Sequence, residues 1–162
     1  MQKYEELLVS LRKIIRSIDL HSKKLNKDSG LTGPQLLVLQ EIQSNKGVSA
    51  KDIATKVNLS QGTITTILDR LESRQTIERT RSEFDRRKVS IHLTGKGESL
   101  LEKSPKPLQD HFIERFQALE DWEQNLLLSS FSRVATMMDA ADLDAAPLLE
   151  IGPIVAKSPE EH

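Results

Sequence analysis

The sequence predicts a mainly α fold in which several helices surround one short β-hairpin. The 162-residue chain is 37% hydrophobic but only 4% aromatic, which favours one domain with a core of Leu, Ile and Val. Apolar residues recur at three- and four-residue steps over most of the chain, as they do along helices. The alternation of apolar and polar residues that is typical of strands is confined to residues 76–81 and 88–93.

The composition excludes several kinds of functional site. The chain contains no Cys, which excludes disulfides, thiolate zinc sites and thiol-based redox sensors. Its four His form no cluster with metal-ligand spacing, and the sequence has neither a phosphate-binding glycine loop nor a nucleophile elbow. We therefore predict no catalytic residue, metal or cofactor. No apolar run approaches the roughly 18 residues that a membrane span needs, and we expect a soluble, cytoplasmic protein.

Charge is distributed unevenly along the chain. Residues 49–96 carry ten Lys and Arg against six Asp and Glu, whereas residues 97–162 carry five against thirteen. A basic middle part favours a surface that faces a polyanion, and an ordinary solvated surface is the alternative.

A long N-terminal helix is predicted for residues 1–30. Its positions on one stripe are Tyr4, Leu7, Leu11, Ile14, Ile18, His21 and Leu25. Gly30 fits a left-handed helix end. A stripe of this length needs a partner, either the rest of the domain or a second subunit. Because His21 stands among apolar positions, it is either a satisfied interface residue or a candidate for effector binding.

Residues 31–97 predict three short helices followed by a hairpin. The first two helices begin with capping boxes, formed by Thr32 with Gln35 and by Ser49 with Asp52. Ser60 caps the third helix, which runs to about Arg74. A three-residue turn at 58–60 and the small Ala54, where the last two helices cross, favour a helix-turn-helix over a plain helical hairpin.

The hairpin makes this unit a winged helix-turn-helix. The two strands turn Ile77, Val89, Ile91 and Leu93 inward, and the loop 82–87 between them is rich in cations. Such a unit suits DNA, because the second helix of the pair fits the major groove and the wing fits the neighbouring minor groove.

The last part of the chain predicts helices that end in a tail. Thr94 caps a helix, and Pro105 and Pro107 predict a break near Ser104. A final helix from about Asp121 carries a second stripe, made of Leu127, Phe131, Val134, Met138 and Ala141. We assign residues 98–141 to dimerisation helices and residues 142–162 to a tail that is partly disordered unless it docks.

Three motifs in order resemble MarR-type transcriptional regulators. They are residues 59–72 (LSQGTITTILDRLE), 85–87 (DRR) and 93–97 (LTGKG). The resemblance implies a homodimer formed by the N- and C-terminal helices. It also implies that the dimer binds a pseudo-palindromic double-stranded DNA operator, usually as a repressor. A small-molecule effector would release it by entering the cleft between the dimerisation and DNA-binding regions. A helical protein-interaction module is the alternative.

Transfer of the motifs, position by position, assigns residues to DNA binding. These are Ser60, Gln61, Gly62, Thr63, Thr65, Thr66, Arg70, Arg86 and Arg87. Arg74 and Lys88, just outside the motifs, are added because their side chains are expected to contact phosphate. Gln pairs with adenine, and Arg pairs with guanine or phosphate. Asp85 is expected to orient an arginine of the wing, because a carboxylate repels phosphate. Arg86 and Arg87 compete for the minor groove, and the sequence does not choose between them.

Three features depart from that family pattern: Gln75, the prolines Pro105 and Pro107 where the family usually has one unbroken helix, and a tail after Asp142 that is longer than the family core. Gln75 stands where the family commonly has Gly, so either a left-handed helix stop costs roughly 1–2 kcal/mol or the helix ends differently. Residues 145–149 (AAPLL) resemble the ends of a subgroup that controls compatible-solute genes such as those for ectoine. That likeness implies an osmolyte-responsive regulator as the specific role.

Overall fold

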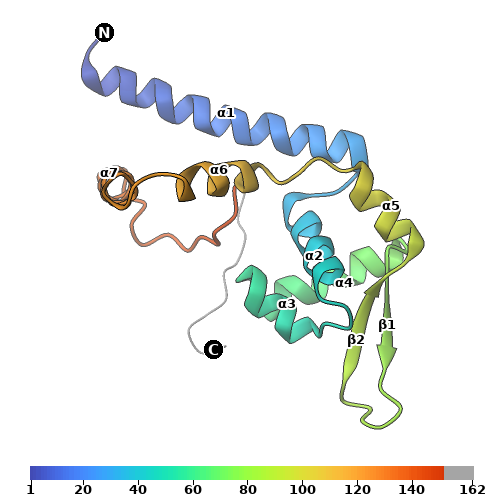
Figure 1. The fold of residues 1–162 in the computed structure, drawn as a ribbon. Coiled ribbons are helices and arrows are strands. Elements are labelled where there is room, and N and C mark those ends of the chain that lie inside the picture. Colours follow the sequence, from blue (N-terminus) through green and yellow to red (C-terminus); the bar gives the residue numbers. More distant parts are fainter. Residues whose placement is uncertain (152–162) are drawn as a thin grey trace.

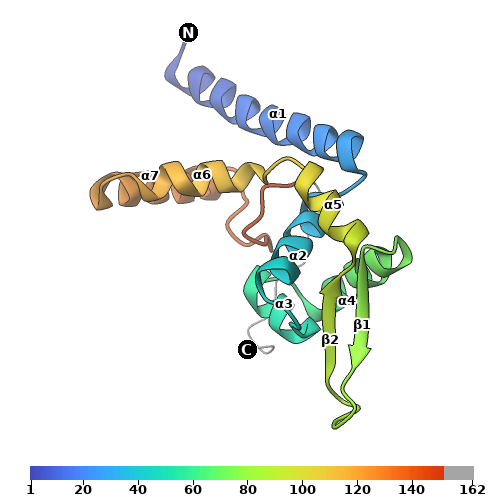
Figure 2. The ribbon, with the colours of Figure 1, turned by 45° about the vertical axis from the view of Figure 1, so that its right-hand side comes forward.

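The computed structural model describes residues 1–151, and within them it confirms a mainly α fold with one hairpin. The elements are α1 (Lys3–Ser29), α2 (Gly33–Ser44), α3 (Ala50–Val57), α4 (Gln61–Ser73), β1 (Ile77–Arg81), β2 (Val89–Leu93), α5 (Gly95–Lys103), α6 (Leu108–Gln117) and α7 (Asp121–Met137). Helices α2, α3, α4 and α5 gather around the base of the hairpin (Figure 1). Figure 2 shows α1, α6 and α7 on the side of the molecule opposite the wing tip.

The sequence-predicted caps explain where most of the helices begin. Thr32 and Gln35 form the complete capping box of α2, and Ser60 accepts the Thr63 amide at the start of α4. Gly30 ends α1 with φ of 68°, the left-handed conformation that glycine adopts without strain. The box predicted at the start of α3 is only half formed, because Ser49 accepts from the backbone amide of Asp52 without a reciprocal bond among the described residues.

The buried core lies between α2, α3, α4 and the hairpin. Its members that are at most 2% exposed include Leu36, Leu39, Ile53, Ala54, Leu59, Ile64, Leu68, Leu71, Ile77 and Ile91. Ala54 is fully buried in α3, as expected for a small residue at a helix crossing. The amide of Ile91 also donates to the carbonyl of Val48 at 3.0 Å, which joins the start of α3 to β2. This single bridge was not predicted, because one residue carries no periodic pattern.

The hairpin is fixed at its base by the end of α4. Strands β1 and β2 pair antiparallel from Ile77 opposite Leu93 to Arg81 opposite Val89. Gln75 has φ of 61°, so α4 ends with a left-handed residue, which is one of the two possibilities that the sequence left open. The carbonyl of Gln75 accepts the Thr94 hydroxyl at 2.6 Å, which joins the exit of α4 to the start of α5.

The C-terminal helices show the predicted break and differ from the prediction at the end of α7. The helix breaks after Lys103, with Ser104 as an extended C-cap, because Pro105 and Pro107 cannot continue it. Helix α7 ends at Met137, so the prediction that Met138 and Ala141 lie on its stripe is wrong. The helix stops because Asp139 adopts φ of 55°, and the Ala140 amide then donates to the carbonyl of Ala135 at 2.9 Å.

The described part of the tail, residues 142–151, docks on the body of the protein. Ala146 packs against the buried core, and Glu150 contacts both α1 and α2 through its carboxylate. The rest of the predicted tail, including Pro153 and Pro159, lies outside the described residues.

Candidate nucleic-acid interface

Helix α4 presents a polar face opposite its buried side. Ile64, Ile67, Leu68 and Leu71 point into the core, so the 3.6-residue period turns the other positions outward. The exposed residues include Gln61, Gly62, Thr65, Thr66 and Arg70, as predicted. Ser60 and Thr63 are half-buried and build the helix start: the Ser60 Oγ accepts the Thr63 amide at 3.1 Å and lies 2.8 Å from the Thr63 hydroxyl.

The hydrogen bonds of two threonines determine what this face offers to a ligand. The hydroxyls of Thr65 and Thr66 donate to the carbonyls of Gln61 at 2.9 Å and Gly62 at 3.1 Å. With their protons used inside the helix, these hydroxyls offer lone pairs outward, together with methyl groups. Amino groups of adenine and cytosine and the thymine methyl are matching partners in a major groove. A Cβ at Gly62 would meet no atom within 4 Å, so the fold leaves open space there.

Arg79 of β1 joins the hairpin to the acidic residues of α4. Its Nη2 lies 2.7 Å from the Asp69 carboxylate, and its Nε lies 3.4 Å from the Glu72 carboxylate. Exposed ion pairs contribute at most about 1 kcal/mol to stability. The main effect of these pairs is therefore on the position of the hairpin and on the local charge. Arg79 neutralises two anions beside Arg70 and holds the hairpin against α4. The sequence predicted only that this arginine points outward, because its partners lie in another element.

Arg74 makes a structural contact that the sequence did not predict. Its guanidinium donates to the carbonyls of Ser29 and Gly30, both at 3.0 Å, and so caps the C-terminus of α1. Cations stabilise the negative end of a helix. Because these bonds hold the guanidinium against the end of α1, we propose that Arg74 has a structural role and does not contact phosphate.

The tip of the hairpin is a turn held by its own side chains. The hydroxyl of Ser82 accepts the amides of Phe84 and Asp85 at 3.3 Å, and a carboxylate oxygen of Asp85 accepts the Arg87 amide at 3.0 Å. Asp85 therefore orients the backbone of the wing, and no bond from Asp85 to a guanidinium occurs within residues 1–151. Arg86, Arg87 and Lys88 are exposed, and their side chains remain available to a ligand.

Phe84 is a feature of the wing that the sequence reasoning missed. Its side chain is 100% exposed at the tip, between Glu83 and Asp85. A ring this exposed buries no area against the described part of the chain, so the fold does not depend on it. The available signal was a lone aromatic residue within an otherwise polar loop.

His21 of α1 contacts a backbone carbonyl in the segment between α5 and α6. Its Nε2 lies 2.9 Å from the carbonyl of Lys106, so the ring joins α1 to the proline-containing segment between α5 and α6. This is the contact of a satisfied interface residue. An effector role for His21 stays a prediction.

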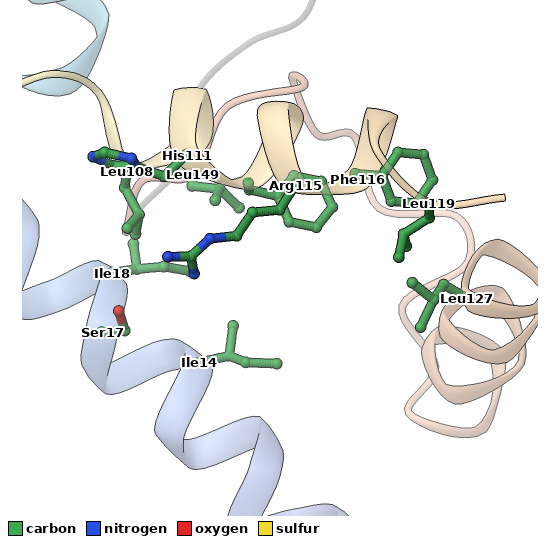
Figure 3. Close-up of a pocket in the computed structure, with 11 residues that line it drawn as sticks. Ile14, Ser17, Ile18, Leu108, His111, Arg115, Phe116, Leu119, Leu127 and Leu149 are labelled. Carbon is green, nitrogen blue, oxygen red and sulfur yellow. The ribbon is translucent and has the colours of Figure 1, made fainter. Parts of the chain in front are cut away.

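A cavity of about 480 Å³ lies between α1, α6 and α7. Its walls are mainly apolar, and its basic side chains, Arg115 and His111, come from α6 (Figure 3). Arg115 extends from α6 toward Ile18 of α1, and His111 lies at one end. Leu149 of the tail also lines this space. The arrangement suits a small molecule with an apolar body and a polar or anionic group.

Two further observations concern metals and membranes. Among residues 1–151, no group of three or more His, Cys, Asp and Glu side chains is placed to hold a metal ion. No helix in the same range is long and apolar enough to cross a bilayer.

Comparisons with known proteins agree with this geometry. Residues 31–89 match the model of the MarR family. The chain is 39% identical over 97 residues to the HTH-type transcriptional regulator MgrA of Staphylococcus aureus, a match that covers 59% of this chain and 66% of that protein, just under two thirds of its length.

Solved structures share the fold over a longer stretch. A MepR-like protein complexed with pseudoligands aligns with a TM-score of 0.58 and 27% identity, covering 85% of this chain and 97% of that one. The transcriptional regulator BldR from Sulfolobus solfataricus aligns with a TM-score of 0.53 and 27% identity, covering 85% and 99%.

Proposed function

Because the chain belongs to the MarR family, whose members are regulators and not enzymes, we propose that it is a transcriptional repressor that binds double-stranded DNA. One observation carries the proposal: Arg79 holds the hairpin, whose tip carries exposed cations, against helix α4 and its exposed polar face. Helix α4 enters the major groove, and the wing reaches the adjacent minor groove. Such a regulator acts in the cytoplasm, where its operator is.

The DNA-contacting set is Ser60, Gln61, Gly62, Thr63, Thr65, Thr66, Arg70, Arg86, Arg87 and Lys88, with Asp85 holding the wing tip. Gln61 and the two outward threonines read base edges, and Arg70 reaches guanine or phosphate. Arg86 or Arg87 inserts into the minor groove, which attracts guanidinium where A·T pairs narrow it. The exposed Phe84 adds an apolar contact at the same tip.

The repressor acts as a homodimer. Large apolar side chains on α1, α6 and α7 are exposed in the single chain; they include Tyr4, Leu7, Ile14, Phe112, Trp122, Leu126, Leu128 and Phe131. An exposed apolar surface of this kind marks a protein–protein contact. In a homodimer the second copy presents the same residues, so the two apolar surfaces cover each other. Two recognition helices in a dimer read half-sites about 10 bp apart on one face of the duplex. A monomer in sedimentation at micromolar concentration would contradict this.

A small organic molecule or ion controls the repressor by binding where the dimerisation helices meet the DNA-binding unit. The related MepR-like protein was solved with pseudoligands, which supports a small-molecule partner. To change operator affinity about 5–150-fold, such an effector needs roughly 1–3 kcal/mol of differential affinity between two states of the dimer. A thermal-shift screen of metabolites identifies candidates.

The first experiment is an equilibrium titration of the chain with DNA from upstream of its own gene. We expect saturable binding of a dimer, and a protected site with two half-sites. Replacement of Gln61, Thr65 or Thr66 by Ala weakens binding to the operator by about 1–3 kcal/mol and affects random DNA little. Lys103→Ala, an exposed cation at the end of α5, is the matched control. The proposal fails if wild-type protein binds operator and random DNA equally weakly.

A further inference from the structure

The tail beyond α7 returns to the junction between the dimerisation helices and the winged helix. Ala146 packs against the core, and Pro147 lines a shallow cavity that is also lined by side chains of α2, α3 and α6. Leu149 lines the cavity between α1, α6 and α7 (Figure 3). Its amide donates to the Gln109 side chain at 3.4 Å. One short segment therefore contacts both parts of the protein.

Glu150 is the polar anchor of this segment. One of its carboxylate oxygens accepts the Ser22 hydroxyl of α1 at 2.7 Å, and the other accepts the Gly33 amide at 3.1 Å. Gly33 is the first residue of α2, so its amide has no partner within the helix and lies at the positive end of the helix dipole. A single carboxylate thus bridges a dimerisation helix and the first helix of the DNA-binding unit.

The glycine at position 33 leaves room for this contact. A Cβ built on Gly33 would lie 2.5 Å from the Glu150 carboxylate oxygen. The backbone of Gly33 is not in the left-handed region, so helix α2 does not itself need glycine there. An alanine at this position would displace the end of the flexible Glu150 side chain from the Gly33 amide.

We propose that residues 145–151 form an intramolecular strap, with Glu150 as its latch, that holds α1 and α2 in the arrangement that binds DNA. This inference rests on the proposed function for its effect on DNA. In a dimer the recognition helices are positioned through the junction between α1 and α2 in each subunit. A latched junction is already ordered in the free protein, so less conformational entropy is lost when both recognition helices dock on DNA. Release of the latch therefore weakens operator binding.

Two substitutions remove the latch in different ways. Glu150→Gln removes the charge and keeps the volume of the side chain. Gly33→Ala keeps Glu150 but fills the space that its carboxylate needs. Alanine is also the better helix residue, so Gly33→Ala does not unfold α2. Asp144→Asn, an exposed acidic residue just before the strap, is the control.

Hydrogen exchange on the full chain without DNA tests the strap itself. We expect the Gly33 amide and residues 145–151 to exchange several times faster in Glu150→Gln and in Gly33→Ala. Asp144→Asn should exchange as the wild type does. Unchanged exchange in both latch variants, with unchanged circular dichroism, overturns the strap.

Operator titrations then test the effect on DNA. Both latch variants are expected to bind operator about fivefold more weakly or worse, within the range of allosteric couplings. Faster exchange with wild-type operator affinity would overturn the coupling to DNA. If the wild type binds no specific DNA, the proposed function and the coupling both fall, whereas the exchange data still decide whether the strap is docked.

Discussion

Replacing Gly97 with alanine tests how the wing is attached to the body. Gly97 is buried in the first turn of α5, and a Cβ there would overlap the carbonyl oxygen of Thr76, directly before β1. That carbonyl is not free to retreat, because it accepts the Thr94 amide at 3.0 Å. The Thr76 amide in turn donates to the carbonyl of Leu71 at 3.1 Å. The added methyl therefore forces the start of α5 away from the hairpin.

The structure sets the size of this effect. Overpacking a filled site costs about 1–3 kcal/mol, and weakening the bond between Thr94 and Thr76 adds about 0.5–1.5 kcal/mol. We expect Gly97→Ala to lower the free energy of unfolding by about 2–3 kcal/mol. At roughly 2–4 °C per kcal/mol for a chain of this size, the Tm falls by about 4–12 °C.

Urea unfolding followed by circular dichroism measures this difference. The control is Gly95→Ala in the same helical turn, where a Cβ meets nothing within 4 Å. Gly95→Ala should leave stability unchanged or raise it by up to about 1 kcal/mol, since alanine restricts the unfolded chain. Equal stability of Gly97→Ala and the wild type would refute the close approach of α5 to the hairpin.

Three other substitutions test an expected DNA contact, a structural contact and a carboxyl group with a raised pKa. Phe84→Ala should weaken operator binding without changing its dependence on salt, because an apolar contact releases no counterions; titrations at several salt concentrations check this. Arg74→Ala should destabilise the protein by about 1–2 kcal/mol in urea, because it uncaps α1, and should leave operator affinity nearly unchanged. Burial and the neighbouring Glu114 raise the pKa of Asp110, so its ionisation disfavours the folded state as pH rises through that pKa. Asp110→Asn should therefore have a higher Tm than the wild type at pH 7, and the two melting curves should converge below about pH 3.5.

Local sequence signals predicted the elements that local chemistry determines. Thr32, Ser60 and Thr94 cap helices because each side chain accepts an amide three residues ahead, and that spacing is visible in the sequence. Pro105 and Pro107 end α5 for a reason that is equally local. The outward face of α4 followed from the helical period once its start was known.

Contacts between distant residues were not predictable in the same way. Arg74 follows the recognition helix, where a cation suits phosphate, yet its partners are carbonyls at the end of α1. The pairing of Glu150 with Ser22 spans most of the chain and has no periodic signature. The end of α7 was missed because apolar spacing continued past Asp139, whose left-handed backbone stops the helix.

The central claim is that α4 and the wing together bind DNA, and the wing arginines test it most directly. Binding isotherms on the operator should be measured at several salt concentrations for Arg86→Ala, Arg87→Ala and the double variant. The inserting arginine should contribute about 1–3 kcal/mol, mostly on A·T-rich flanks. Lys88→Ala should weaken all sequences alike and reduce the salt slope by about one unit. Wild-type affinity in the double arginine variant would contradict the claim.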